Sequence, residues 1–252
     1  MIELKNVSSG YDGTPVIDDI TLKFLPGVVT VLLGPNGCGK STLLKTALGI
    51  VQASSGEILY DCQDIHSLTV RDIAKKAAYL SQSRNVPNIT VGRMVLHGRF
   101  PYLSYPRHYS SEDHKIVKDA LQKTGSLELQ NHQMNELSGG QRQKVYVSMA
   151  LAQRAKTIFM DEPTTYLDVR HQFETMQIAK ELAESGTAVV MVLHDLSLAL
   201  QFADQVAILD HGRLVQIGTS EEVFHSGVLD QVFGVHVHRI STETDWHYYC
   251  QL

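Results

Sequence analysis

A glycine-rich segment containing a lysine and two hydroxyl residues offers the clearest chemistry in the sequence. It follows the apolar run 28–33 and consists of Gly34, Pro35, Asn36, Gly37, Cys38, Gly39, Lys40, Ser41 and Thr42. The glycines allow the backbone N–H groups to face an oxyanion, and a helix that begins at Lys40 adds its positive N-terminal dipole. In this pattern the lysine contacts the β- and γ-phosphates, and the hydroxyl of Ser41 binds Mg²⁺. The segment predicts a nucleoside triphosphate site.

Two consecutive carboxylates follow a second apolar run, 157–160. Ligands of open α/β sheets bind at the carboxyl ends of the strands, and this is where the run would deliver Asp161 and Glu162. Asp161 fits a carboxylate that holds Mg²⁺, and Glu162 fits a general base that polarises the attacking water. Strands also end in acids simply because loops are solvated. Only the combination with the glycine-rich segment favours a catalytic role.

A third motif opens a predicted helix and consists of Leu137, Ser138, Gly139, Gly140 and Gln141. Ser138 is a good N-cap, and the glycines expose backbone N–H groups at a second anion-binding helix terminus. With this LSGGQ segment the chain resembles the nucleotide-binding subunits of ATP-binding cassette (ABC) transporters. The resemblance implies that two copies pair head to tail around two ATP molecules. Each copy's LSGGQ segment then faces the ATP, with its Mg²⁺, that is bound by the other copy.

The resemblance covers essentially the whole chain and implies roles for four further residues. Tyr11 matches the aromatic residue that stacks on adenine, although it also suits an ordinary turn. Gln82 matches the glutamine that reaches Mg²⁺ and the attacking water, and His194 matches the histidine that contacts the γ-phosphate. Asp168 matches the loop that touches the opposite copy. Because Glu162 is also present, we expect a hydrolytically competent ATPase.

Two local segments are similar to one subgroup of the family. The run 162–168, Glu-Pro-Thr-Thr-Tyr-Leu-Asp, continues into His171 and Gln172, and 98–102 reads Gly-Arg-Phe-Pro-Tyr. Both resemble importers of ferric siderophores, haem and vitamin B12. We therefore expect the ATP-hydrolysing subunit of such an importer, with a separate membrane permease. The cassette of a zinc or manganese importer is the alternative.

The segment 84–107 is the expected contact with the permease. It contains a group of aromatic and apolar residues beside two arginines: Phe100, Tyr102, Leu103, Tyr105, Arg99 and Arg107. Exposed aromatic and arginine side chains suit a protein interface, and the family resemblance implies that this region receives the permease. Charge reversal at Arg99 is then expected to uncouple transport and to leave basal ATPase activity nearly intact. Packing onto a small satellite core is the alternative. The importer would also depend, indirectly, on an extracytoplasmic substrate-binding protein.

Composition excludes several other classes of protein. The chain has 252 residues, of which 43% are hydrophobic and 19% charged, and its net charge is −5. It lacks the basic footprint of a nucleic-acid binder. No apolar run approaches the ~20 residues that span a bilayer, and no secretory leader or cysteine framework is evident. We expect a peripheral protein at the cytoplasmic side of the cell (inner) membrane.

Apolar β-branched runs alternate with helical stretches, which favours a parallel α/β core. With the family resemblance, the pattern predicts an α/β fold: a P-loop NTPase (RecA-like) core, an N-terminal antiparallel β subdomain and an inserted α-helical subdomain. We expect one domain over 1–252, with 1–83 and 156–252 as the core and 84–155 as the insert. The strands are expected at 2–7, 20–24, 28–33, 56–60, 78–81, 157–160, 188–193, 205–209, 213–217 and 236–240. The main helices are expected at 40–49, 111–124, 139–153, 170–185 and 196–202.

Twelve histidines suggest a rival class, an ATP-binding regulator that responds to a metal or haem. His236 and His238 would share one face of a strand, with His247 nearby, a spacing compatible with metal binding. Cys38 raises a different possibility, because a thiol near a helix N-terminus can have a lowered pKa. Its alkylation would then block ATPase activity. Equally, Cys38 is simply a small residue that fits its loop.

Overall fold

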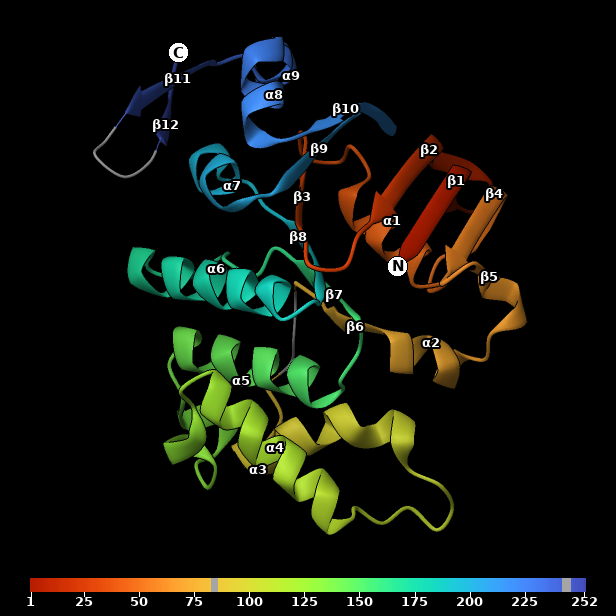
Figure 1. The fold of residues 1–252 in the computed structure, drawn as a ribbon, viewed down its shortest axis with the longest axis vertical. Helices are drawn as coiled ribbons and strands as arrows, with labels where there is room; N and C mark the ends of the chain where they lie inside the picture. Colours follow the sequence, from red (N-terminus) through yellow and green to blue (C-terminus); the bar gives the residue numbers. More distant parts are fainter. Residues whose placement is uncertain (83–85, 242–245) are drawn as a thin grey trace.

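The computed structural model describes residues 1–82, 86–241 and 246–252. The N-terminal part forms an antiparallel sheet with strand order β2-β1-β4-β5, on the right in Figure 1. Its members are β1 (Ile2–Tyr11), β2 (Thr14–Phe24), β4 (Ala53–Tyr60) and β5 (Gln63–Asp64). The expected antiparallel β subdomain is present.

A six-stranded sheet with order β10-β9-β3-β8-β7-β6 forms the centre of the molecule. Its strands are β3 (Val29–Leu33), β6 (Ala77–Leu80), β7 (Thr157–Asp161), β8 (Ala188–Val192), β9 (Gln205–Asp210) and β10 (Arg213–Gly218). Every neighbouring pair is parallel except β9 with β10. The prediction of a parallel α/β core is confirmed.

Two hydrophobic cores cover the two faces of this sheet. Successive side chains of a strand point to opposite faces, so Val31 and Leu33 join the core on the helical side, whereas Leu32 joins the core that also contains the antiparallel sheet. All five residues of β3, β7 and β8 are buried. These three strands therefore hold their carboxyl ends in fixed positions.

Helices surround the sheet and fill the segment between β6 and β7. The α-helices are α1 (Lys40–Ala47), α2 (Val70–Lys76), α3 (Val91–Leu96), α4 (Ser111–Lys123), α5 (Gly139–Ala152), α6 (Val169–Glu184), α7 (Leu196–Phe202), α8 (Ser220–Ser226) and α9 (Val228–Phe233). Short 3₁₀ helices are η1 (Ile65–Ser67), η2 (His97–Tyr102), η3 (Leu127–Leu129) and η4 (Met134–Glu136).

Helices α3 to α5 form one group on the far side of α6 from the rest of the molecule (Figure 1). They correspond to the expected helical insert, and α3, α4 and α5 pack on one another. Its exact limits, 84 and 155, stay a prediction, and residues 83–85 at the first limit lie outside the described part of the chain.

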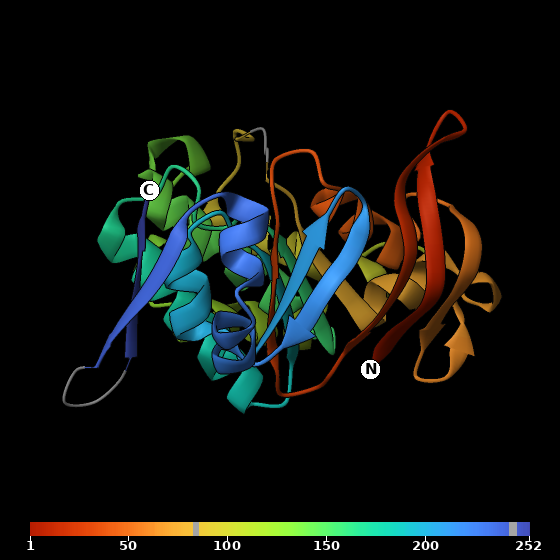
Figure 2. The same cartoon turned by 90° about the horizontal axis from the view of Figure 1, so that it is seen from above.

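The chain ends in a hairpin of β11 (His236–Ser241) and β12 (Trp246–Gln251). In Figures 1 and 2 this hairpin lies at the opposite side of the molecule from the antiparallel sheet. Strand β12 packs on α7. In β11, Val237 and Arg239 are half-buried whereas His236 and His238 are exposed, which confirms the predicted half-buried strand.

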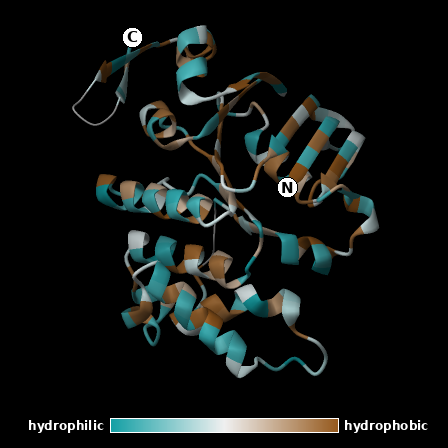
Figure 3. Ribbon diagram, in the orientation of Figure 1, coloured by the Kyte–Doolittle hydropathy of each residue, from teal (hydrophilic) through white to brown (hydrophobic). Residues whose placement is uncertain are grey.

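Hydrophilic and hydrophobic residues alternate along the helices in Figure 3. This pattern belongs to helices that pack one face on a protein core. Among the described residues, no helix combines the length and the hydropathy that crossing a membrane requires.

Candidate functional site

The glycine-rich segment 34–39 lies at the carboxyl end of β3 and leads into α1. Gly34 has φ 151°, and a Cβ there would come within 2.1 Å of the carbonyl oxygen of Leu209. Gly39 has φ 103°, and its Cβ would meet Ile17 at 2.7 Å. Any side chain at these two positions would push the loop off its neighbours. The path of the loop therefore depends on glycine.

Lys40 is buried within this loop. Its ammonium donates hydrogen bonds to the carbonyl oxygens of Gly34, at 2.7 Å, and Pro35, at 2.9 Å. Among the described residues, no side chain caps the start of α1, and its first turn has no acid. The N–H groups of that turn therefore have no side-chain cap, and the ammonium of Lys40 lies beside them, which suits an anion.

Asp161, at the end of β7, lies beside Ser41. The Ser41 hydroxyl donates to Asp161 Oδ1 at 2.8 Å, and the Tyr79 hydroxyl donates to Oδ2 at 3.1 Å. A hydroxyl and a carboxylate are the hard oxygen donors that Mg²⁺ prefers, so the pair fits that ion. Sequence reasoning missed Tyr79, which lies on the neighbouring strand β6 and holds the carboxylate in place.

Glu162 is the next residue and has a positive φ of 50°. One carboxylate oxygen lies 2.6 Å from Nε2 of His194, and the other accepts hydrogen bonds from Gln82 and Thr165. Three separate elements thus meet at this carboxylate. The structure brings the predicted Glu162, Gln82 and His194 together, and it adds Thr165.

A cavity of about 170 Å³ lies between the glycine-rich segment with Lys40 and the pair Glu162 and His194. Its lining comprises Val16, Asn36, Gly37, Gly39, Lys40, Ser41, Thr42, Glu162 and His194. A second cavity adjoins it on the side of Pro35 and Cys38. The arrangement places an ammonium, free helix N–H groups and a hydrogen-bonded carboxylate around one space. It can hold a polyphosphate and activate a water beside it.

The segment 138–141 caps α5 with its own side chains. Ser138 Oγ accepts from the N–H of Gln141 at 3.3 Å, and the Gln141 side chain accepts from the N–H of Ser138 at 3.0 Å. Ser138 and Gly139 are exposed, and neither is among the residues that line the cavity at Lys40. A capping box explains the pattern at this helix start, but it does not explain the exposed glycine.

The family model described as "ABC transporter" matches residues 17–165, which is more than half of the chain. The chain belongs to the ABC transporter family. It is an ATP-binding subunit, and its fold is the ABC cassette.

Similar proteins of known role support this assignment. FhuC, the iron(3+)-hydroxamate import ATP-binding protein of Bacillus subtilis (strain 168), is 39% identical over 236 residues, which cover 93% of this chain and 88% of FhuC. HmuV, the hemin import ATP-binding protein of Rhodococcus jostii (strain RHA1), is 38% identical over 223 residues, which cover 88% of this chain and 76% of HmuV. The dimeric structure of MJ0796, a bacterial ABC transporter cassette, matches with a TM-score of 0.75 at 29% identity, covering 87% of this chain and 99% of that one.

The cassette's predicted adenine-stacking residue, Tyr11, ends β1 in a tight turn and is 46% exposed. The following strand, β2, supplies Val16 to the cavity at Lys40. Tyr11 itself is not among the lining residues, so its role stays a prediction.

The loop before α6 of the cassette ends in Asp168, which caps that helix. Its carboxylate accepts from the N–H of His171 at 2.9 Å and lies 2.7 Å from the His171 ring nitrogen Nδ1. These contacts lower the pKa of Asp168. Asp168 is not among the residues that line the cavity at Lys40, and its expected contact with a second copy stays a prediction.

The structure contradicts the expectation of a reactive Cys38. The residue is 5% exposed, and burial raises the pKa of its thiol although nearby Lys40 opposes the shift. In this cassette burial outweighs the effect of the helix N-terminus. Cys38 fits as a small loop residue.

The expectation that Arg99 is an exposed interface residue is also wrong. Arg99 is 6% exposed, donates to Asp113 at 2.8 Å and to the carbonyl of Ala152 at 2.8 Å, and stacks over the ring of Tyr102. It is a structural residue of the insert. Phe100, Tyr105 and Arg107 of the segment 84–107 are exposed, and Arg84, at its start, lies outside the described residues.

In the described part of the chain, the histidines form no metal centre. Within the ranges that the structure describes, no group of three or more potential ligands could hold a metal ion. His236 instead contacts Asp230 at 3.1 Å, and His238 stacks on Tyr249.

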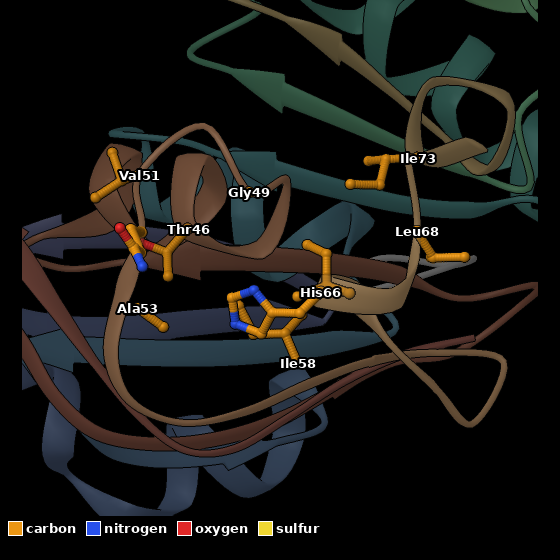
Figure 4. Close-up of a pocket in the computed structure, with 10 residues that line it drawn as sticks. Thr46, Gly49, Val51, Ala53, Ile58, His66, Leu68 and Ile73 are labelled. Carbon is orange, nitrogen blue, oxygen red and sulfur yellow. The ribbon is translucent and has the colours of Figure 1, made fainter. Parts of the chain in front are cut away.

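A cavity of about 320 Å³ lies at the opposite end of α1 from Lys40 (Figure 4). Its lining comprises Thr46, Gly49, Val51, Gln52, Ala53, Ile58, Ile65, His66, Leu68 and Ile73. It has no lysine, arginine or carboxylate in its lining. It therefore does not offer the groups that the phosphates of ATP and a metal ion need.

Proposed function

We propose that this cassette is the ATP-hydrolysing subunit of an importer for an iron complex, a ferric siderophore or haem. The similarity to FhuC and HmuV supports the cargo class. The 162–168 segment and the 98–102 segment support the same subgroup, in which vitamin B12 is a further cargo. The observation that carries the enzymatic part is Glu162, held by Gln82, Thr165 and His194 at the cavity beside Lys40.

Binding of ATP follows from the groups around the cavity. The loop N–H groups, the start of α1 and Lys40 neutralise the β- and γ-phosphates. Ser41 and Asp161 would hold Mg²⁺, with Gln82 also close to the site. When bound, this ion supplies positive charge to the phosphate oxygens. The side chains on the adenine side include Tyr11.

Hydrolysis depends on Glu162 and the side chains that contact it. Glu162 accepts a proton from the attacking water as general base. His194, 2.6 Å from Glu162, orients that carboxylate and lies beside the position of the γ-phosphate. Gln82 and Thr165 hold the other carboxylate oxygen. The side chain of Glu162 thereby has one orientation.

Two copies complete the enzyme. Each ATP site at the glycine-rich segment 34–42 (the P-loop) receives the exposed 138–141 segment of the other copy. Asp168 contacts that copy as well. The dimeric structure of the similar cassette MJ0796 supports this arrangement. ATP stabilises the closed dimer because it contacts both copies, and hydrolysis removes that link. ATP can favour the closed dimer only if it binds the closed state more tightly than the open state.

The closure acts on a membrane permease. We propose that the permease binds the surface around Phe100, Tyr105 and Arg107, which are exposed on the insert. The cassette then lies at the cytoplasmic side of the inner membrane. An extracytoplasmic binding protein supplies the cargo.

Uptake by a strain that lacks the gene tests this function. The strain receives labelled ferric siderophore, haem, vitamin B12, Zn²⁺ and Mn²⁺, with complementation by wild type or by Glu162→Gln. Loss of uptake of one iron complex, restored by wild type alone, is the expected result. Loss restricted to Zn²⁺ or Mn²⁺ would contradict the cargo class. Full restoration by Glu162→Gln would contradict the role of Glu162.

A further inference from the structure

His171 lies in the first turn of α6 with its ring fixed on one side by Asp168. Nδ1 lies 2.7 Å from the Asp168 carboxylate, and the His171 N–H donates to the same oxygen at 2.9 Å. Only 28% of the side chain is exposed. The ring therefore has one position relative to the loop that ends in Asp168.

The other side of this ring lies on Gly140, in the 138–141 segment. A Cβ on Gly140 would come within 2.1 Å of Cδ2 and 2.5 Å of Nε2 of the ring. Gly140 is buried although its neighbours Ser138 and Gly139 are exposed. The imidazole ring thus fills the space between the Asp168 loop and the start of α5.

Contacts continue from this ring to the catalytic carboxylate. Gln172, next to His171, donates to the carbonyl oxygens of Leu167 and Thr164. The hydroxyl of Thr165, between these two residues, donates to Glu162 at 3.1 Å. One short stretch of chain therefore joins Glu162 to Asp168, and His171 joins Asp168 to Gly140.

We propose that His171 is a positioning residue that couples the two ATP sites of the dimer. This inference rests on the proposed sandwich. There, Glu162 acts on the ATP of its own chain, and Gly140 belongs to the segment that closes on the ATP of the other. His171 contacts neither ATP. It fixes the 138–141 segment relative to the loop that carries Glu162, so that both sites close together.

The coupling predicts that both contacts of the His171 ring contribute to dimerisation. His171→Asn keeps a side-chain N–H donor for Asp168 but loses the ring on Gly140. His171→Phe keeps the ring and loses the donor. His171→Ala loses both contacts of the ring. These three variants separate the hydrogen bond from the packing.

A second bridge between α5 and α6 provides a matched control. Lys144 lies 2.8 Å from Glu174, one turn further along the two helices, which run side by side in Figure 1. Lys144→Ala removes an α5–α6 contact without touching Asp168 or Gly140.

The experiment measures ATP-dependent dimerisation in the Glu162→Gln background by analytical ultracentrifugation. His171→Ala is expected to raise the dimer dissociation constant about tenfold, a coupling of the usual size for linked sites. His171→Asn and His171→Phe fall in between, and Lys144→Ala stays within about twofold. The affinity of the monomer for ATP, measured by calorimetry below the dimerisation concentration, stays unchanged. Thermal melting confirms that each variant folds.

Three results would overturn the inference. The first is a His171→Ala protein that dimerises like its parent. The second is an equal loss for His171→Ala and Lys144→Ala, which indicates general α5–α6 packing. The third is full dimerisation by either half variant, which shows that one contact suffices. A parent Glu162→Gln protein that stays monomeric with ATP would instead contradict the proposed sandwich itself.

Discussion

The P-loop region and the 138–141 segment are both helix N-termini with glycines, yet they differ in what surrounds them. Lys40 shares a cavity with Glu162 and His194, and Asp161 contacts Ser41, all within one chain. Ser138 and Gly139 are exposed, and Ser138 is bonded by the capping box to the start of its own helix. One region gathers its groups within one chain, and the other leaves a glycine-containing helix start exposed. In the proposed sandwich, nucleotide binding is therefore a property of one chain, whereas hydrolysis requires two.

The largest expected effect is at the site around Lys40, where one substitution should abolish ATP hydrolysis and leave ATP binding intact. Glu162→Gln removes the general base and keeps the hydrogen-bonding shape, so the ATPase rate should fall about 10²–10⁴-fold. ATP affinity should stay within about threefold, because Lys40 and the loop N–H groups are untouched. Phosphate release and calorimetry measure the two quantities. A parallel loss of both would mean that Glu162 serves binding.

Mixing two inactive proteins tests whether the second region acts on the other copy. Lys40→Ala disables the P-loop, and Ser138→Arg blocks the 138–141 segment. A hybrid dimer keeps one intact site. Random mixing of equal amounts should restore about a quarter of wild-type ATPase activity. A mixture of Lys40→Ala with Glu162→Gln is the control and should stay inactive, because both residues serve the same site. Equal recovery in the two mixtures would contradict action in trans.

A smaller effect concerns the scaffold that carries the 138–141 segment. Arg99→Ala leaves the buried Asp113 without its partner and should lower the free energy of unfolding by about 3–5 kcal/mol. Arg107→Ala, at an exposed position later in the same segment, should cost under about 0.5 kcal/mol. Chemical denaturation measures both. An Arg99 variant as stable as Arg107→Ala would show that the ion pair does not support the insert.

The same ion pair has a defined pH dependence. Burial alone would raise the pKa of Asp113, but hydrogen bonds from Arg99 and Ser110 lower it to about 2 from the ordinary value of 3.8. The folded state therefore gains stability above pH ~4 and loses it as the pH falls toward 2. The stability difference between wild type and Arg99→Ala should shrink over this interval. Urea midpoints at pH 6, 4 and 3 measure it.

The smallest effect is a reaction rate at the P-loop itself. Burial raises the pKa of Cys38, whereas Cys62 is exposed. At pH 7 N-ethylmaleimide should modify Cys62 at least about tenfold faster than Cys38, because the thiolate is the nucleophile. Mass spectrometry of the labelled peptides gives both rates. Comparable rates would restore the idea of a reactive thiol in the loop.

Strong local signals allowed most of the core to be predicted from the sequence. The nearly all apolar runs around Val31, Phe159 and Val190 form the buried strands β3, β7 and β8, because parallel strands covered on both faces need mostly apolar residues. Predicted and observed ends of these strands differ by one residue. The side chains of Gln82 and His194 both contact Glu162. They lie together because the ends of parallel strands, and the loops that follow them, share one edge of the sheet.

Some elements that are short or have no buried residue could not be predicted in this way. Helix α2 has no buried residue, so it lacks an amphipathic pattern, although the capping pair Thr69 and Asp72 was a usable signal. Helix α3, helices α8 and α9, and strand β12 are six or seven residues long, which is too short for a clear period.

Side-chain burial depends on tertiary contacts, which the sequence hides. Arg99 looked like a surface arginine because its neighbours include Phe100 and Arg107. Its partner Asp113 lies fourteen residues away on α4, and Ala152 lies at the end of α5. Nothing in the local pattern indicates these partners. Tyr79 and His171 were not assigned contacts for the same reason.

The complete burial of β3, β7 and β8 has a consequence for the slow motions of this cassette. Amide hydrogens in strands that are buried and paired on both sides exchange with water only when the whole domain unfolds. The P-loop directly follows β3, and Asp161 is the last residue of β7. The residues proposed to bind ATP and Mg²⁺ therefore lie at the ends of the strands whose amides exchange last. The exposed start of α6 and the outer face of the C-terminal hairpin should exchange first. A deuterium-labelling time course would therefore rank the strands that carry the P-loop and Asp161 among the most protected in the protein, and the exposed start of α6 and the hairpin among the least.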